Sequence, residues 1–96
     1  MEQTEKILIY PKKRVTIVTE RVTVAKTVKT DDYCSIVFYN QGTSNAYLFG
    51  TIKVIPNQSH EFNFDANEVI ETPTPITFES GAGLVNDVVV TKIYKK

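Results

Sequence analysis

The stretch from Cys34 to Phe64 is the feature that most constrains how this chain can fold. Apolar and polar side chains alternate in three runs within it, separated by two segments rich in Asn, Gly, Pro and Ser. Successive side chains of a strand point to opposite faces, so a period of two is typical of strands with one buried face. The pattern predicts three strands, at 34–39, 46–55 and 60–64, joined by two turns.

One face of these three runs is predicted to build the core. Its members are large and apolar: Ile36, Phe38, Leu48, Ile52, Phe62 and Phe64. Cys34 shares this face, and no His or Lys flanks it to lower its pKa, so we expect a small buried hydrophobe rather than a reactive thiol. Gly50, in the middle of the second run, predicts a bulge or the close approach of another backbone.

The composition extends this prediction to the whole chain. Val, Ile and Thr account for 33 of the 96 residues, against 3 Leu and 4 Ala. Branching at Cβ favours strands over helices, and a chain of this length forms one domain. We therefore expect an all-β fold, a small antiparallel β-sandwich of about seven or eight strands, immunoglobulin-like or jelly-roll-like.

The two ends of the sandwich region show departures from simple alternation. Apolar residues change parity between Val15 and Val28, which predicts two strands, at about 14–19 and 21–29, or one long bulged strand. The last predicted strand, 84–94, is apolar on both faces at Val88-Val89-Val90. A strand of that kind is buried on both sides, and we expect another subunit to cover one of them.

Charge divides the chain, although its net charge is zero. Residues 1–30 carry seven Lys or Arg and three Glu, residues 31–87 carry one Lys and eight acids, and residues 88–96 carry three Lys. We predict a basic N-terminal arm with a short strand at 1–14 and a sandwich domain at 15–96. The cations Lys12, Lys13 and Arg14 form either a solvated turn or a contact with an acidic surface, including one on another copy. The cluster is too short and the chain too neutral to favour nucleic acid.

No catalytic, cofactor or metal site is expected. The chain has one His and one Cys, far apart in sequence, and no nucleophile motif that would assemble a catalytic group. Zinc needs three or four such ligands, and one cysteine excludes an internal disulfide. No segment has the apolar length of a membrane span, and the start lacks the pattern of a signal peptide, which predicts synthesis in the cytoplasm.

Three aromatic residues form the one predicted binding surface: Tyr39, Tyr47 and Phe49. If strands 34–39 and 46–55 pair, these rings cluster on the face opposite the core, as an interface or a platform for carbohydrate. If the second sheet covers that face, they are core residues instead.

Three segments carry a resemblance to a known class of proteins: Asn40-Gln41-Gly42, Pro56-Asn57-Gln58-Ser59 and the Val-rich strand Leu84–Val90. Over residues 34–94 the chain resembles the small β-sandwich accessory or decoration proteins of tailed bacteriophage virions. The resemblance implies a non-enzymatic structural protein that decorates or cements a capsid or tail. Its expected partners are other virion proteins and copies of itself, and its expected location is the virion, assembled in the host cytoplasm.

Two other functions remain open from the sequence. One is a carbohydrate- or cell-surface-binding module that uses the aromatic face. The other is a small phage-encoded inhibitor of a host protein, which would use the acidic region 31–87 against a basic partner.

Overall fold

The computed structural model describes residues 14–65, 68 and 70–95, and in these residues the chain forms eight strands and no helix. The all-β prediction is confirmed, with a strand number at the upper end of the expected range. The strands are β1 (Val15–Val22), β2 (Lys26–Val28), β3 (Ser35–Asn40), β4 (Ala46–Leu48), β5 (Ile52–Val54), β6 (Ser59–Asn63), β7 (Thr74–Phe78) and β8 (Val88–Lys95).

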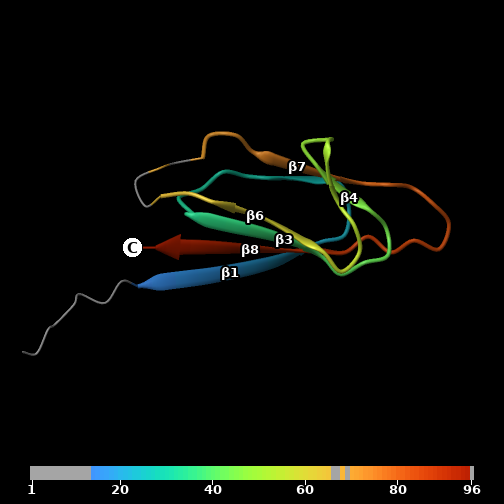
Figure 1. Cartoon of the computed structure of the whole chain (residues 1–96), viewed down its shortest axis with the longest axis horizontal. Coiled ribbons are helices and arrows are strands. Elements are labelled where there is room, and N and C mark those ends of the chain that lie inside the picture. The colour runs from blue at the N-terminus through green and yellow to red at the C-terminus, as the bar shows by residue number, and fades with distance from the viewer. Residues whose placement is uncertain (1–13, 66–67, 69, 96) are drawn as a thin grey trace, which may run out of the picture.

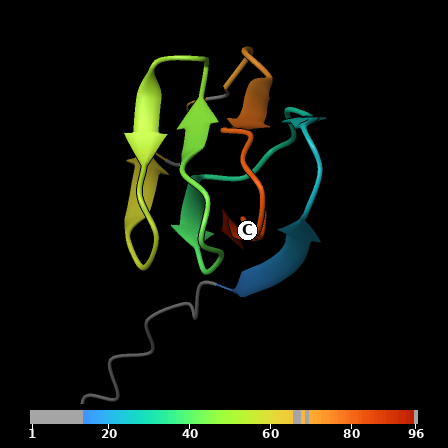
Figure 2. The same cartoon turned by 90° about the vertical axis from the view of Figure 1, so that its right-hand side faces the viewer.

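The strands form two antiparallel sheets of four that lie face to face (Figures 1 and 2). Sheet A has the order β1-β8-β3-β6, and sheet B has the order β2-β7-β4-β5. β1 and β2 lie at one edge of the sandwich, and β5 and β6 lie at the other (Figure 2). Among the described strands, β4 and β5 are the only consecutive pair within one sheet, so almost every connection crosses between the layers.

The core lies between the sheets and is built by alternate residues of each strand. Its largest side chains come from both layers: Tyr33, Ile36, Phe38, Leu48, Ile76, Val22, Val28, Val88 and Val90. Full burial of each such side chain stabilises the fold by about 1.5–3 kcal/mol. The predicted inward face is confirmed, because Ile36, Phe38 and Leu48 are buried, and Ile52, Phe62 and Phe64 pack against them. Cys34 is buried too, with its thiol 3.2 Å from the carbonyl oxygen of Ile93.

The predicted single strand over 46–55 is wrong, because the chain reverses at Phe49-Gly50. Both residues have left-handed backbones, with φ of 54° and 72°, and Thr51 N–H donates to Leu48 O at 3.1 Å. The turn occupies three residues, so even-numbered positions face the core both before and after it. Period alone therefore cannot distinguish this hairpin from one continuous strand.

The stretch 34–64 consequently forms four strands distributed over two sheets. β3 pairs with β6 and β8 in sheet A, whereas β4 and β5 belong to sheet B. Residues 15–28 form two strands, which is one of the two predicted alternatives, but the bounds are Val15–Val22 and Lys26–Val28 rather than 14–19 and 21–29. The alternative of one long bulged strand is wrong. β1 pairs with β8 in unbroken register from Val15 to Val22, so Val15 and Ile17 face away from the core that Val22 enters.

Candidate functional site

The outward side of sheet A is a candidate interface, because it carries apolar side chains where solvent would be expected. Inward positions are fixed by the buried residues of the core, so the odd-numbered residues of β1, β3, β6 and β8 face outward. We call the apolar members of this set the outer face: Val15, Ile17, Val37, Tyr39, Val89 and Ile93. Ile17 is 62% exposed, Val15 51% and Tyr39 39%, and the other three are partly exposed.

The strand register makes these side chains neighbours. Ile17 lies beside Ile93, and Val89 lies beside Tyr39, while Thr19 and Thr91 lie side by side between these two pairs. The apolar side chains of the outer face therefore form two groups with threonines between them. Polar residues of β6, namely Ser59, Glu61 and Asn63, border the outer face on one side.

β1 adds a free backbone edge to this surface. Within the described part of the chain, β1 pairs with β8 alone, and its other edge has no neighbouring strand. Unpaired N–H and C=O groups along an eight-residue strand provide a site for pairing with another chain. The outer face and this edge are therefore contiguous.

A polar cluster closes the end of the sandwich where β3 leads into the loop 41–45. Asn40 is fully buried, and its amide donates to Ser44 O at 2.7 Å and to Val54 O at 2.9 Å. Its own side-chain oxygen accepts the Gly42 N–H at 3.0 Å. All its polar atoms are satisfied inside the protein, so this residue acts in folding.

Asp87 holds the same loop from the other side. Arg21 donates to both carboxylate oxygens, at 3.2 and 2.5 Å, and Gln41 Nε2 donates to one of them at 2.9 Å. These hydrogen bonds, first from Arg21 and then from Gln41, lower the pKa of Asp87 below its ordinary value. We call Asn40, Gly42, Ser44 and Asp87 the loop cluster.

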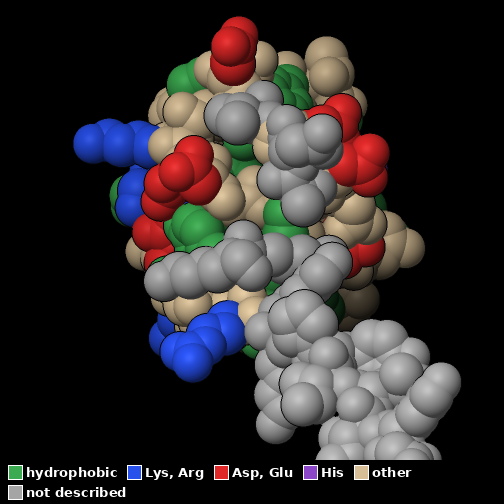
Figure 3. Space-filling view, turned by 90° about the vertical axis from the view of Figure 1, so that its left-hand side faces the viewer, with side chains coloured by type: hydrophobic (Ala, Val, Ile, Leu, Met, Phe, Trp, Pro, Cys, Tyr) green, Lys and Arg blue, Asp and Glu red, His purple; other side chains and the backbone are tan. Residues whose placement is uncertain are grey.

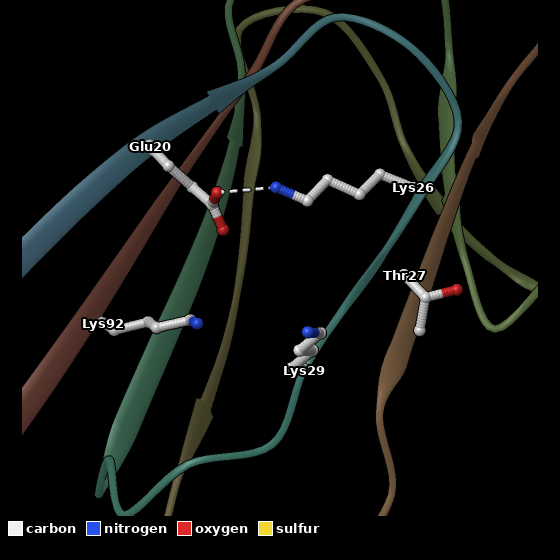
Figure 4. Close-up of a pocket in the computed structure, with 5 residues that line it drawn as sticks. All are labelled: Glu20, Lys26, Thr27, Lys29 and Lys92. Carbon is white, nitrogen blue, oxygen red and sulfur yellow. Dashed lines mark hydrogen bonds and ion pairs between the residues drawn. The ribbon is translucent and has the colours of Figure 1, made fainter.

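A hollow of about 360 Å³ opens at the β1/β2 edge, between the two sheets, and cations line it (Figure 4). We call it the lysine pocket. It is lined by Glu20, Lys26, Thr27, Lys29 and Lys92. Glu20 and Lys92 come from sheet A, while the other three belong to β2 or follow it directly.

Of the three lysines, only Lys26 forms an ion pair within the described residues, although the pKa of Asp31 is lowered by hydrogen bonds and also by the charge of Lys92. Lys26 Nζ lies 2.9 Å from Glu20 Oε2. Lys29 and Lys92 reach into the same open space (Figure 4), and neither has an acidic partner within 4 Å among the described residues. In the view of Figure 3, the visible Lys and Arg side chains lie along the left side of the molecule, and acidic side chains lie on both sides.

An aromatic pair adjoins Lys92. The ammonium of Lys92 lies 5.6 Å from the centre of the Tyr33 ring. The Tyr33 ring meets the Tyr94 ring edge-on, with 6.2 Å between the ring centres. Tyr94 donates to Asp31 at 3.0 Å, and burial together with this hydrogen bond raises the pKa of Tyr94 to about 12. Burial also raises the pKa of Tyr33, whose hydroxyl has no hydrogen-bond partner in the described residues. Both phenols therefore stay neutral near pH 7.

The structure separates the three aromatic residues predicted to form one surface. Tyr39 lies on the outer face of sheet A, whereas Tyr47 faces outward from sheet B, on the opposite side of the sandwich. Phe49 lies in the β4–β5 turn, where it packs against the core and meets Phe62 edge-on at 6.2 Å. β3 and β4 do not pair, so the condition for a cluster is not met.

The predicted basic contact falls mostly outside the described residues. Lys12 and Lys13 lie there, and Arg14 is exposed directly before β1. The lysine pocket was not predicted, although Lys92 carries a signal: it interrupts the alternation Val88, Val90 at a core-facing position.

Comparison with protein-family models and with curated proteins finds no relative of this chain. No protein-family model matches the chain, and no curated protein gives a significant match. Among the described residues, no group of three or more His, Cys, Asp or Glu could hold a metal ion. In the same residues no helix has the length and apolar character needed to cross a membrane.

Proposed function

We propose that this protein is a non-enzymatic structural component of a bacteriophage virion, which decorates or cements the capsid or tail through contacts between its own copies. The observation that carries the proposal is the outer face. An antiparallel sheet with one side in solvent normally turns polar residues outward. Here Ile17 and Ile93 form one apolar pair and Val89 and Tyr39 form another, with Thr19 and Thr91 between them. Exposed apolar surface of this kind marks an interaction site.

The strand order supports the jelly-roll alternative over the immunoglobulin-like one. In immunoglobulin domains the first two strands are neighbours in one sheet. Here β1 and β2 lie in opposite sheets, and the eight strands divide equally between the layers. Eight strands in two sheets of interleaved Greek keys describe a jelly roll, a fold of viral capsid proteins and lectins. The role in a virion rests on this analogy and on the sequence resemblance.

A second copy of the chain is the proposed occupant of the outer face. Apolar surface covers apolar surface in an isologous contact. A two-fold axis along the strands would place β8 of one copy over β3 of the other. Val89 of each copy would then lie over Tyr39 of its partner copy, because these two residues stand at the same level of the sheet.

The size of the face predicts a weak contact. Four strands about 4.8 Å apart and six residues long cover roughly 400 Å², about half of what each partner buries in a standard interface. Free copies should therefore associate weakly. Copies attached to one particle would gain affinity from many simultaneous contacts.

Sedimentation velocity over a wide range of concentration tests the contact. The average mass of the wild type should rise with concentration, and Ile17→Asp should abolish the rise. Val24→Asp is the matched control, because Val24 is 68% exposed in the β1–β2 connection and lies off the outer face. A wild type that stays monomeric throughout, or equal effects of the two substitutions, would overturn the proposed contact.

The virion assignment has its own tests. Mass spectrometry of purified particles should detect the chain, and particles without it would refute the assignment. The basic arm 1–14 is proposed to anchor the protein by charge, so deleting it should weaken attachment and remove its salt dependence. Attachment with unchanged salt sensitivity after the deletion would show that the arm is not the anchor.

A further inference from the structure

We propose that the lysine pocket binds the oxyanion of a small polar ligand, a carboxylate or phosphate group carried on a hydroxylated molecule. The site lies between the sheets at the β1/β2 edge, whereas the outer face lies on the far side of sheet A. Ligand binding is therefore a second function, independent of the proposed assembly.

The charge of the pocket selects an anion. The Glu20–Lys26 ion pair cancels internally, and Lys29 and Lys92 leave two positive charges that face the same space (Figure 4). An oxyanion between these two ammonium groups would accept a charge-assisted hydrogen bond from each of them.

Lys92 is placed there by the fold. β8 is paired on both sides, with Val18 of β1 and Ile36 of β3 opposite Lys92. This register directs the side chain to the inner side of sheet A, two residues beyond the fully buried Val90. An apolar residue would continue the core at this position. A charge in its place is a local violation of the pattern, of the kind that occurs at functional sites.

The remaining lining residues indicate the rest of the ligand. Glu20 holds Lys26 and retains a second carboxylate oxygen as an acceptor, whereas the hydroxyl of Thr27 points away from the lysines (Figure 4). The free carboxylate oxygen suits a ligand hydroxyl. A hollow of about 360 Å³ lies at the lower end of small-molecule sites, a size that fits a monosaccharide acid or a sugar phosphate rather than a folded partner.

The competing explanation is that inward charges only protect the edge of the sheet. Inward-pointing charged residues near an edge strand discourage pairing with other chains, and this role requires no ligand. In that case Lys29 and Lys92 would show no more affinity for anions than any exposed lysine.

Titrations of the full chain with glucuronate, glucose 6-phosphate, inorganic phosphate and glucose distinguish these explanations. We expect the amide signals of Thr27, Lys29 and Lys92 to shift with the three anions and not with glucose. Whichever of glucuronate and glucose 6-phosphate binds with the higher affinity identifies the oxyanion as carboxylate or phosphate. Inorganic phosphate should bind more weakly than glucose 6-phosphate if the hydroxyls contribute.

Substitutions test the named side chains. Lys92→Met and Lys29→Met keep apolar stems and remove the charges, and each should weaken binding about 10-fold or more, as expected for a lost charged hydrogen bond. Lys53→Met is the matched control, because Lys53 is exposed on β5 at the opposite edge. Equal losses in all three variants, or no saturable binding to the wild type, would overturn the proposal.

Two further measurements separate failure of the site from failure of the fold or of the assembly. Circular dichroism and thermal unfolding should show that the Met variants fold. The Ile17→Asp variant should retain wild-type affinity for the anion, since the outer face contributes nothing to the pocket. Loss of binding in that variant would contradict the independence of the two functions.

Discussion

The loop cluster and the lysine pocket are both polar and both adjoin the core, yet their chemistry differs. In the loop cluster each buried polar group meets a partner, as Asn40 does with Ser44, Val54 and Gly42. In the lysine pocket, Lys29 and Lys92 have no acidic partner within 4 Å in the described residues. The polar groups of the loop cluster are hydrogen-bonded within the chain, whereas two ammonium groups of the lysine pocket remain able to bind an anion.

The contrast separates polar residues that specify the fold from those available to a ligand. A fully satisfied buried network rigidifies its surroundings, and removing one member leaves the others unpaired at a high cost. A partly exposed cation without a partner contributes little to stability, and its removal leaves nothing unsatisfied. Substitution should therefore destabilise the first region strongly and the second not at all.

Asn40→Ala should have the largest effect. It removes the amide that donates to the buried Ser44 and Val54 carbonyl oxygens, at about 1–3 kcal/mol for each lost bond before relaxation or water entry, whereas the Gly42 N–H still donates to the carbonyl oxygen of Asp87. We expect a loss of about 3 kcal/mol in the free energy of unfolding, measured by urea denaturation. Gln58→Ala, at an exposed position, is the control, and a loss below about 1 kcal/mol for Asn40→Ala would show that the network is not needed.

Gly42→Ala should have the next largest effect. An added Cβ would collide with the carbonyl oxygen of Val85 and lie 2.8 Å from Asp87 N, both rigid backbone atoms. We expect a loss of about 2 kcal/mol from the displaced loop.

Gly50→Ala provides the comparison for that loss. Gly50 has open space around it but a φ of 72°. The substitution should therefore lower the free energy of unfolding by only about 1 kcal/mol, through backbone strain. Thermal or urea unfolding of both variants measures the difference. If Gly50→Ala lost more stability than Gly42→Ala, the left-handed backbone at Gly50 would matter more than the close approach of Val85 and Asp87 to Gly42.

The sequence was sufficient for the fold class and the core, and insufficient for the strand order. Alternation identifies Ile36 and Phe38 as inward-facing wherever their strand lies, because burial of one face requires it. Pairing partners are set by contacts between distant residues, such as Val37 with Thr91. Even-numbered residues also face the core both before and after the turn at Gly50, so the alternation alone does not reveal that the chain reverses there.

The candidate sites were less predictable for the same reason. The outer face depends on Ile17 lying beside Ile93, a relation across 76 residues of sequence. Lys92 becomes unusual only when the register places it inward, beside the buried Ile36. The two-sided apolar character of 88–90 did indicate the outer face, since Val89 belongs to it.

Protonation of Asp87 at low pH should have a smaller effect on the free energy of unfolding. Its folded-state pKa is lowered by the bonds from Arg21 and Gln41, so these bonds contribute fully above the unfolded-state pKa of about 3.9. The contribution is lost as the pH falls through the folded-state pKa. Urea unfolding of wild type and Asp87→Asn between neutral pH and about pH 3 should give curves that converge in acid.

The exposed Gln58, which has no titratable group, supplies the control for that experiment. Gln58→Ala should run parallel to the wild type over the same range. A constant gap between wild type and Asp87→Asn down to the lowest pH would show that the Asp87 charge is not what stabilises the loop cluster.

Lys92→Met should have the smallest effect on stability and the opposite sign to Asn40→Ala. It removes a cation from a core-facing position and keeps an apolar stem over Tyr33, while giving up a cation–π contact at 5.6 Å. We expect the free energy of unfolding to stay the same or to rise by up to about 1 kcal/mol, because desolvation of the charge no longer opposes folding. Lys53→Met, on the exposed surface of β5, sets the baseline in the same urea experiment. If Lys92→Met instead lost as much stability as Asn40→Ala, Lys92 would belong to the folding machinery, and the distinction between a closed cluster and an open pocket would fail.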